Sequence, residues 1–167
     1  RPLEFCEGEL DGRRHILVFD GAMSEAQLLV NWTKVCFWPY GYNSFHCDIT
    51  ADLKVGANEV TVLLENRPQS SRWYPGAGLY RKVRHITLPQ VYIPVWGTYI
   101  TTPHIEKDYA TVNIKTKVEG VENGSVITVR TKIIDIEDMN VIAQSTDTRP
   151  LFNGEIDQNN TVLLDDT

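Results

Sequence analysis

Apolar and polar residues alternate with a period of two along most of the chain. In the segment 110–118, "ATVNIKTKV", Val112, Ile114 and Val118 share one face, while Lys115 and Lys117 point to the other. This spacing predicts a half-buried β-strand, because successive side chains of a strand point to opposite faces. Similar strand-like runs occupy residues 14–19, 27–32, 45–50, 59–64, 81–88 and 125–133. We therefore predict an all-β protein.

Turn-forming residues separate these runs. Asp20-Gly21, Gly41, Gly56 and Pro75-Gly76 each fall between two of them, as expected for the connections of a sandwich or barrel. Glu122-Asn123-Gly124 joins the runs 110–118 and 125–133, and residues of this kind accept the positive φ of a hairpin turn. We expect those two runs to pair as a hairpin.

Three prolines mark a boundary in the middle of the chain. Pro89, Pro94 and Pro103 lie within fifteen residues of one another, and proline removes a hydrogen-bond donor from a sheet. We place the division near residue 89, which gives two β units, 1–88 and 89–167. The chain begins at Arg1 without a methionine and in mid-pattern, so we expect it to be a piece of a longer protein.

Charge and hydropathy exclude several classes of protein. The formal net charge of −6 argues against nucleic acid, which requires clustered Lys and Arg. No apolar run approaches the roughly 20 residues that cross a bilayer, so we expect no membrane partner. Cys6, Cys36 and Cys47 have no zinc-like or redox spacing, and we interpret them as small buried apolar residues. Localisation stays open.

The common spacings of catalytic, nucleotide and metal sites are missing from the sequence. The four histidines each stand alone in a strand-like run, so we assign no metal site and no cofactor. Asp20 and Asp48 lie at strand ends, where a carboxylate usually organises a turn. We assign no catalytic residue.

Aromatic residues gather in two loops. "CFWPYGYNSF" contains Trp38 and Tyr42, and "SSRWYPGAGLYRKV" contains Arg72, Trp73 and Tyr74. Sugar rings stack on aromatic faces and their hydroxyls bind polar side chains, so such loops on a β scaffold suit carbohydrate. They equally suit an interface with another domain, and composition alone leaves both interpretations open. We name these five residues as candidate substrate-binding residues.

Four ordered motifs resemble glycoside hydrolase family 2, the β-galactosidase and β-glucuronidase family. "SSRWYPGAGLYRKV" is similar to the signature that closes the family's sugar-binding domain. Upstream, "LVFDGAMSEAQLLVNWTKV" and "GYNSFHCDITADLKVGANEVTVLLEN" resemble its preceding strand elements, and "VWGTYITTPHI" resembles the entry to its second domain. The series covers about residues 14 to 104 in the family's order.

The resemblance implies a truncated jelly-roll β-sandwich over 1–88 and an incomplete immunoglobulin-like β-sandwich over 89–167. It also implies that the catalytic glutamates lie on a barrel that follows these domains in the same protein. The chain would then be the non-catalytic part of a retaining glycoside hydrolase, with β-galactosidase specificity, a carbohydrate substrate and a homo-oligomeric parent. The alternatives are a stand-alone carbohydrate-binding module and a structural assembly domain.

Two departures from the family pattern concern the loops. Trp32 replaces the glycine of the family's V-N-G turn, so either the turn differs or the strand runs on. Trp38 and Arg72 fall near the positions where some β-galactosidases place an asparagine and an aspartate. We hypothesise that these two side chains line the sugar pocket instead.

Overall fold

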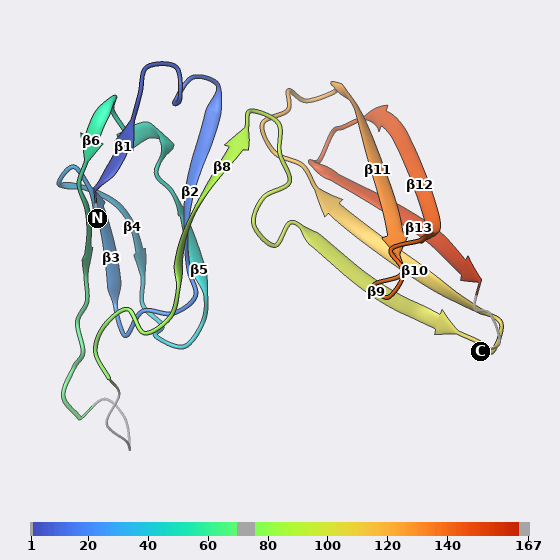
Figure 1. Cartoon of the computed structure of the whole chain (residues 1–167), viewed down its shortest axis with the longest axis horizontal. Coiled ribbons are helices and arrows are strands. Elements are labelled where there is room, and N and C mark those ends of the chain that lie inside the picture. Colours follow the sequence, from blue (N-terminus) through green and yellow to red (C-terminus); the bar gives the residue numbers. More distant parts are fainter. Residues whose placement is uncertain (1, 70–75, 164–167) are drawn as a thin grey trace. The chain divides into compact units, whose positions relative to one another are not determined.

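The computed structural model describes residues 2–69 and 76–163. The prediction of an all-β protein is confirmed, since the described residues form thirteen strands and one short 3₁₀ helix (Figure 1). The chain divides into two compact units, Arg1–Gln90 and Val91–Thr167. Each unit is described by itself below. The domain limits 1–88 and 89–167, and the assignment of a named fold to each, stay predictions.

The first unit is a β-sandwich with a small additional ribbon. Its sheets have the strand orders β5-β2-β8 and β4-β3-β7, and β1 pairs with β6. The strands are β1 (Leu3–Phe5), β2 (Arg13–Phe19), β3 (Ala26–Val30), β4 (Thr33–Trp38), β5 (Phe45–Asp48), β6 (Gly56–Asn58), β7 (Val60–Leu63) and β8 (Val83–Pro89), with the 3₁₀ helix at Thr50–Asp52. The core draws on both sheets, including Leu17 and Phe19 from β2 and Leu28 and Val30 from β3. Burial of these apolar faces supplies most of the stabilisation of such a sandwich.

A disulfide joins β4 and β5, which belong to different sheets. Cys36 and Cys47 are bonded, with their Cα atoms 6.2 Å apart, whereas Cys6 is free and exposed. The interpretation of all three cysteines as small buried apolar residues is therefore wrong: Cys36 and Cys47 form a disulfide, and Cys6 is exposed. The cause is tertiary, because the two sheets bring together cysteines that are eleven residues apart in sequence.

The β3–β4 connection is a tight turn at Asn31 and Trp32. Strand β3 ends at Val30 and β4 begins at Thr33, so the strand does not run on to residue 32. Asn31 has φ 50° and Trp32 has φ 70°. Positive φ at both central residues is typical of a type I′ turn, and for a bulky residue such as tryptophan it costs about 1–3 kcal/mol.

The second unit contains two further sheets. Their strand orders are β13-β10-β9 and β11-β12. The strands are β9 (Thr98–Ile105), β10 (Tyr109–Lys117), β11 (Val126–Ile134), β12 (Val141–Pro150) and β13 (Glu155–Leu163). Val129 of β11 and Ile156 of β13 meet in the core, together with Val118 and Leu151. Buried Gln158 also links the sheets, donating to the carbonyl of Val129 at 3.1 Å and accepting from the hydroxyl of Thr131.

The predicted hairpin between 110–118 and 125–133 is wrong. Strand β10 pairs with β9 and β13, while β11 pairs with β12. Alternation determines which face of each strand is apolar. Strands in either sheet of a sandwich show the same alternation, so the pattern does not determine which strands pair. The segment between the strands passes from one sheet to the other, with Gly120 at φ 78° and Gly124 at φ 86°.

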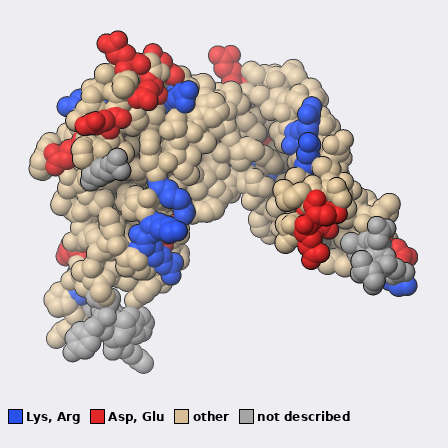
Figure 2. Space-filling model, in the orientation of Figure 1, with Lys and Arg blue, Asp and Glu red and all other residues tan. Residues whose placement is uncertain are grey.

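Charged side chains are spread over the surface. On the face shown in Figure 2, the described acidic and basic residues lie in small separate groups, with no continuous basic band. The part of the chain that the structure describes contains no helix long and apolar enough to cross a bilayer.

Candidate functional site

One end of the first unit gathers the loops that the sequence singles out. Phe19 at the end of β2 lies opposite Phe45, which begins β5, and Val83, which begins β8. Ala26 at the start of β3 lies opposite Trp38 at the end of β4, and Gln27 lies opposite Leu63 of β7. The connections 39–44 and 64–82 therefore leave the two sheets at the same end, which we call the loop end.

Tyr80 holds these two connections together. Its hydroxyl donates a hydrogen bond to the carbonyl oxygen of Gly41 at 2.7 Å. Its ring also lies so close to Gly21 that a Cβ atom there would come within 2.5 Å of Cζ. Two backbone hydrogen bonds between Met23 and Gly78, of 3.0 and 3.2 Å, also join the β2–β3 connection to the connection 64–82. Glycine is needed at position 21 because only a residue without a side chain leaves room for the ring.

Trp38 is anchored in the core rather than displayed on a loop. Its half-buried ring stacks on Phe45 with centroids 5.6 Å apart, and Phe45 stacks on Phe19 at 4.7 Å. Its indole Nε1 is buried and has no hydrogen-bond partner among the described residues. The aromatic stack fixes where β4 ends and hence where the 39–44 connection begins.

Tyr42 lies on the exposed part of this connection. The residue is 43% exposed, and its ring meets the ring of Tyr40 edge to face, with centroids 5.6 Å apart. Aromatic rings that are preorganised and partly open to solvent are suited to stacking on a flat ligand. The other three candidates, Arg72, Trp73 and Tyr74, lie outside the described residues.

A charged group includes the first residues of the connection 64–82. The guanidinium of Arg67 contacts Glu25 at 2.8 Å and Glu65 at 3.2 Å. The two carboxylates, first Glu25 and then Glu65, raise the pKa of Arg67. Ser24 adds a hydrogen bond from its hydroxyl to the carbonyl of Glu65 at 2.7 Å. These contacts tie the end of β7 to the start of β3.

Asp20 and Asp48, the carboxylates at the ends of strand-like runs, are both engaged in contacts within the fold. Asp20 forms a two-pronged ion pair with Arg84, at 2.6 and 2.9 Å. Asp48 accepts hydrogen bonds from the backbone N–H and the hydroxyl of Thr50 and contacts Arg14 at 3.2 Å. Both carboxylates thus use their charge and their hydrogen-bond acceptors for contacts within the fold.

Sequence reasoning missed a pair of histidines. His15 is buried, and its Nδ1 lies 3.1 Å from Nε2 of His85, with the rings stacked. Burial lowers the pKa of His15 and the pKa of His85, and the charge of His15 lowers that of His85 further. Strands β2 and β8 bring them together over a separation of seventy residues, so no local pattern could reveal the pair. In residues 2–69 and 76–163, no group of three or more His, Cys, Asp or Glu is placed to hold a metal ion.

Sequence reasoning also missed Tyr80 and a pocket at the opposite end of the unit. Tyr80 follows a Gly-Ala-Gly step, which signals a close approach of backbone and ring, but its partner Gly41 is 39 residues away. The pocket has a volume of about 610 Å³ and includes Asn31 and Trp32 in its lining. The replacement of a turn glycine by Trp32 was its only signal in the sequence.

Comparison with known proteins gives a consistent result. No protein-family model matches the chain. A β-galactosidase of Bacteroides ovatus, BoGH2A, is 33% identical over 75% of this chain and 15% of its own length. A Formosa agariphila protein named as a β-glucuronidase is 34% identical over 64% of the chain and 10% of its own length. The crystal structure of a glycosyl hydrolase family 2 member from Bacteroides cellulosilyticus superposes with a TM-score of 0.90 at 26% identity, over 99% of this chain and 22% of that protein. The chain thus spans about a seventh or less of the curated relatives that it matches.

Proposed function

The chain belongs to glycoside hydrolase family 2, and we propose that it is the non-catalytic β-sandwich part of a retaining β-galactosidase. In this proposal the parent protein cleaves terminal β-glycosidic bonds. The two catalytic carboxylates lie on a barrel outside these 167 residues. In a retaining enzyme such carboxylates stand about 5–5.5 Å apart, and one of them forms a covalent glycosyl intermediate.

The observation that carries this proposal is the tie between the two connections at the loop end. The hydrogen bond from Tyr80 to Gly41 fixes the 39–44 connection against the segment that leads away from residues 70–75. Loops held in this way by a rigid sandwich are suited to form one wall of a site whose chemistry is supplied elsewhere. The loop end would face the catalytic barrel and its substrate.

Trp38, Tyr42, Arg72, Trp73 and Tyr74 are the residues that we propose for this wall. The exposed ring of Tyr42 would contact the sugar directly, as its fractional exposure allows. The core stacking of Trp38 suits a positioning role, in which its ring sets the course of the loop. Arg72, Trp73 and Tyr74 keep the roles expected from their chemistry, namely hydrogen bonding to hydroxyls and stacking.

Galactoside specificity is the finer part of the proposal. The relative named as a β-galactosidase matches a larger share of the chain than the one named as a β-glucuronidase. A glucuronide differs from a galactoside in carrying a carboxylate. Arg67, near the loop end, is already paired with two carboxylates. Since the proposed wall also includes Arg72, the assay with both substrates decides between a neutral sugar and an anionic one.

The test is to express the natural protein, extended beyond both ends of this chain, beside the 167-residue chain itself. Both proteins are assayed with p-nitrophenyl β-D-galactopyranoside and p-nitrophenyl β-D-glucuronide, and the first-formed anomer is read by NMR. We expect the extended protein to release galactose in the β form and the short chain to be inactive. Hydrolysis by the short chain, or no hydrolysis by the extended protein, would contradict the proposal.

A matched pair of variants tests the wall itself. Tyr42→Ala in the extended protein is expected to raise KM for the galactoside by about tenfold, the loss of roughly 1.4 kcal/mol of stacking. Phe37→Ala is the control, because Phe37 is 46% exposed on neighbouring β4 and is not among the candidates. Equal effects of the two substitutions would remove Tyr42 from the site. Binding of glycans by the short chain without hydrolysis by the extended one would favour a stand-alone carbohydrate-binding module.

A further inference from the structure

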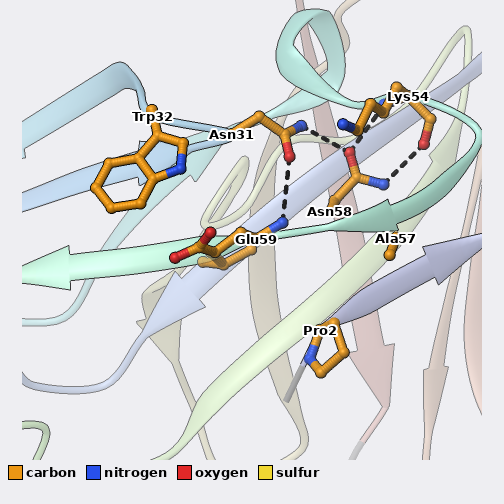
Figure 3. Close-up of a pocket in the computed structure, with 8 residues that line it drawn as sticks. Pro2, Asn31, Trp32, Lys54, Ala57, Asn58 and Glu59 are labelled. Atoms are coloured by element: carbon orange, nitrogen blue, oxygen red, sulfur yellow. Dashed lines mark hydrogen bonds between the residues drawn. The ribbon is translucent and has the colours of Figure 1, made fainter.

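The pocket at the opposite end of the first unit is built around an exposed tryptophan (Figure 3). The register of β3 and β4 places it, since Val30 lies opposite Thr33 at this end and Ala26 lies opposite Trp38 at the loop end. Its volume of about 610 Å³ falls within the range of small-molecule sites, roughly 300–1,000 Å³. Its lining includes Pro2, Asn31, Trp32, Lys54, Asn58 and Glu59.

Neither packing in the core nor the backbone geometry of the turn accounts for a tryptophan at position 32. Trp32 is 75% exposed, so little of its ring is packed against the unit. Its φ of 70° is one that glycine or asparagine adopts readily and that a tryptophan adopts only at a cost. An aromatic ring that is displayed in this way, at a position where glycine would be better for the turn, indicates a role in binding.

The floor beside the ring is rigid. Asn31 donates to the side-chain oxygen of Asn58 at 2.8 Å and to the carbonyl of Asp52 at 2.9 Å, and it accepts from the N–H of Glu59 at 3.2 Å. Asn58 is wholly buried and donates to the carbonyl of Lys54 at 2.7 Å. Figure 3 shows these amides joined to each other at one side of the ring of Trp32. Because their hydrogen bonds are made inside the protein, the amides hold the turn in place rather than meet a ligand.

Two charged side chains complete the pocket. Lys54 and Glu59 belong to its lining. A lysine carries an ammonium donor and a glutamate a carboxylate acceptor. The hydrogen bond that the Glu59 carboxylate makes in the described part of the chain is a long one, 3.4 Å, from the hydroxyl of Thr61. A donor and an acceptor beside an exposed aromatic face match a ring that has C–H bonds on one side and hydroxyls at its edge. The opposite charges balance, so the arrangement favours a neutral ring over an anionic one.

We propose that this pocket is a second carbohydrate-binding site, in which a neutral hexopyranose stacks on Trp32 and bonds through its hydroxyls to Lys54 and Glu59. The inference takes its ligand class, carbohydrate, from the proposed function. It goes beyond that function because the site lies at the other end of the unit from the loops that face the catalytic barrel. Such a site would hold a neighbouring part of a polymeric substrate while the chain end is cleaved elsewhere.

The experiment titrates the full 167-residue chain with methyl β-D-galactopyranoside and with a β-linked galacto-oligosaccharide, followed by protein NMR. We expect millimolar binding with shifts at the Trp32 indole, and at least tenfold weaker binding of Trp32→Gly. The melting temperature of Trp32→Gly should equal or exceed that of the unaltered chain, because glycine adopts the positive φ without strain. A loss of binding in this variant therefore cannot come from unfolding. Glu59→Gln should weaken binding severalfold.

Trp96→Gly is the matched control. Trp96 is also exposed, at 63%, and also has a positive φ, 59°, but it lies in the second unit. The Trp96→Gly variant should bind the sugar as tightly as the unaltered chain does. Unchanged binding by Trp32→Gly, no binding by the unaltered chain, or preference for methyl β-D-glucuronide would overturn the inference.

The two proposals fail separately. Hydrolysis by the extended protein without Trp32-dependent binding would overturn the second site alone. Trp32-dependent binding with no hydrolysis by the extended protein would overturn the proposed function alone.

Discussion

The hydroxyl of Tyr80 donates to the carbonyl oxygen of Gly41 at 2.7 Å, while the same ring occupies the space above Gly21. Tyr80→Phe should therefore lower the free energy of unfolding by about 1 kcal/mol, the usual net value of one such hydrogen bond. Chemical denaturation of the chain measures this change. An effect on the 39–44 connection should appear as altered NMR shifts of Tyr40 and Tyr42.

Gly21→Ala should act through the same contact. The added methyl would come within 2.5 Å of Cζ of Tyr80, so the ring must move and its hydrogen bond is lost. We expect a loss of about 1–3 kcal/mol, the usual cost of overpacking. In the double variant with Tyr80→Phe the two losses should overlap rather than add, and strict additivity would contradict the coupling.

The Cys36–Cys47 disulfide should contribute about 3 kcal/mol to the stability of the first unit. The bond closes a short loop, and the loss of chain entropy in the unfolded state scales with the logarithm of the loop length. Cys36→Ala with Cys47→Ala, or mild reduction, should lower the unfolding free energy by this amount. Cys6→Ala is the control, since Cys6 is exposed and unpaired, and it should change little.

Stability should depend on pH through His15 and His85. Burial lowers the pKa of His15, and partial desolvation and the charge of His15 lower the pKa of His85, both below the ordinary value of 6.5. The unfolded chain therefore binds more protons than the folded one below that pH. The stabilisation is fully present above pH 6.5 and is lost as the pH falls below it. Thermal melts between pH 7.5 and 5.0 measure this effect.

The variant His85→Gln should flatten this profile. It removes one titrating ring from the pair and leaves an amide that can bond to His15. His46→Gln serves as the control, because His46 lies on β5 opposite Val18, whereas the stacked pair consists of His15 and His85. If the melting temperature of His85→Gln changes with pH as steeply as that of the unaltered chain, the histidine pair is not the source of the pH dependence.

Gln158 should be important to the second unit because it spans the two sheets. Gln158→Ala removes the donor to the buried carbonyl of Val129 and the acceptor for Thr131, and it leaves a cavity. The expected loss is about 2–4 kcal/mol. Gln144→Ala, on the exposed face of β12, should cost less than about 0.5 kcal/mol. Urea denaturation of the two variants gives the comparison.

Strand periodicity was sufficient to predict the class of fold but not the pairing of strands. The pattern of Val112, Ile114 and Val118 correctly predicts β10, because alternation is a local property of the backbone. Its partners are β9 and β13 rather than β11, since apolar faces in a sandwich pack against the opposite sheet and do not specify a neighbour. The disulfide and the histidine pair escaped prediction for the same reason.

The candidate site was predictable only in part. The aromatic loops were visible as composition, and Tyr42 is exposed as a loop residue should be, but Trp38 is stacked in the core. Tyr80 was visible only as one more aromatic residue until its contact with Gly41 was known. The replacement of the family's turn glycine by Trp32 drew attention to the turn. The pocket beside this turn also depends on Lys54 and Glu59, which come from a different part of the chain.

The bond between Cys36 and Cys47 has a consequence for the connection that lies between them. Residues 39–44, with Tyr40 and Tyr42, belong to a covalent macrocycle whose two ends cannot drift apart when the strand ends fray. Much of the entropy of ordering this segment is thus lost when the thiols are oxidised, before any ligand arrives. In an oxidising compartment the tyrosines are presented by a closed ring, and in a reducing one the same residues sit on an open chain that must be ordered anew at each encounter.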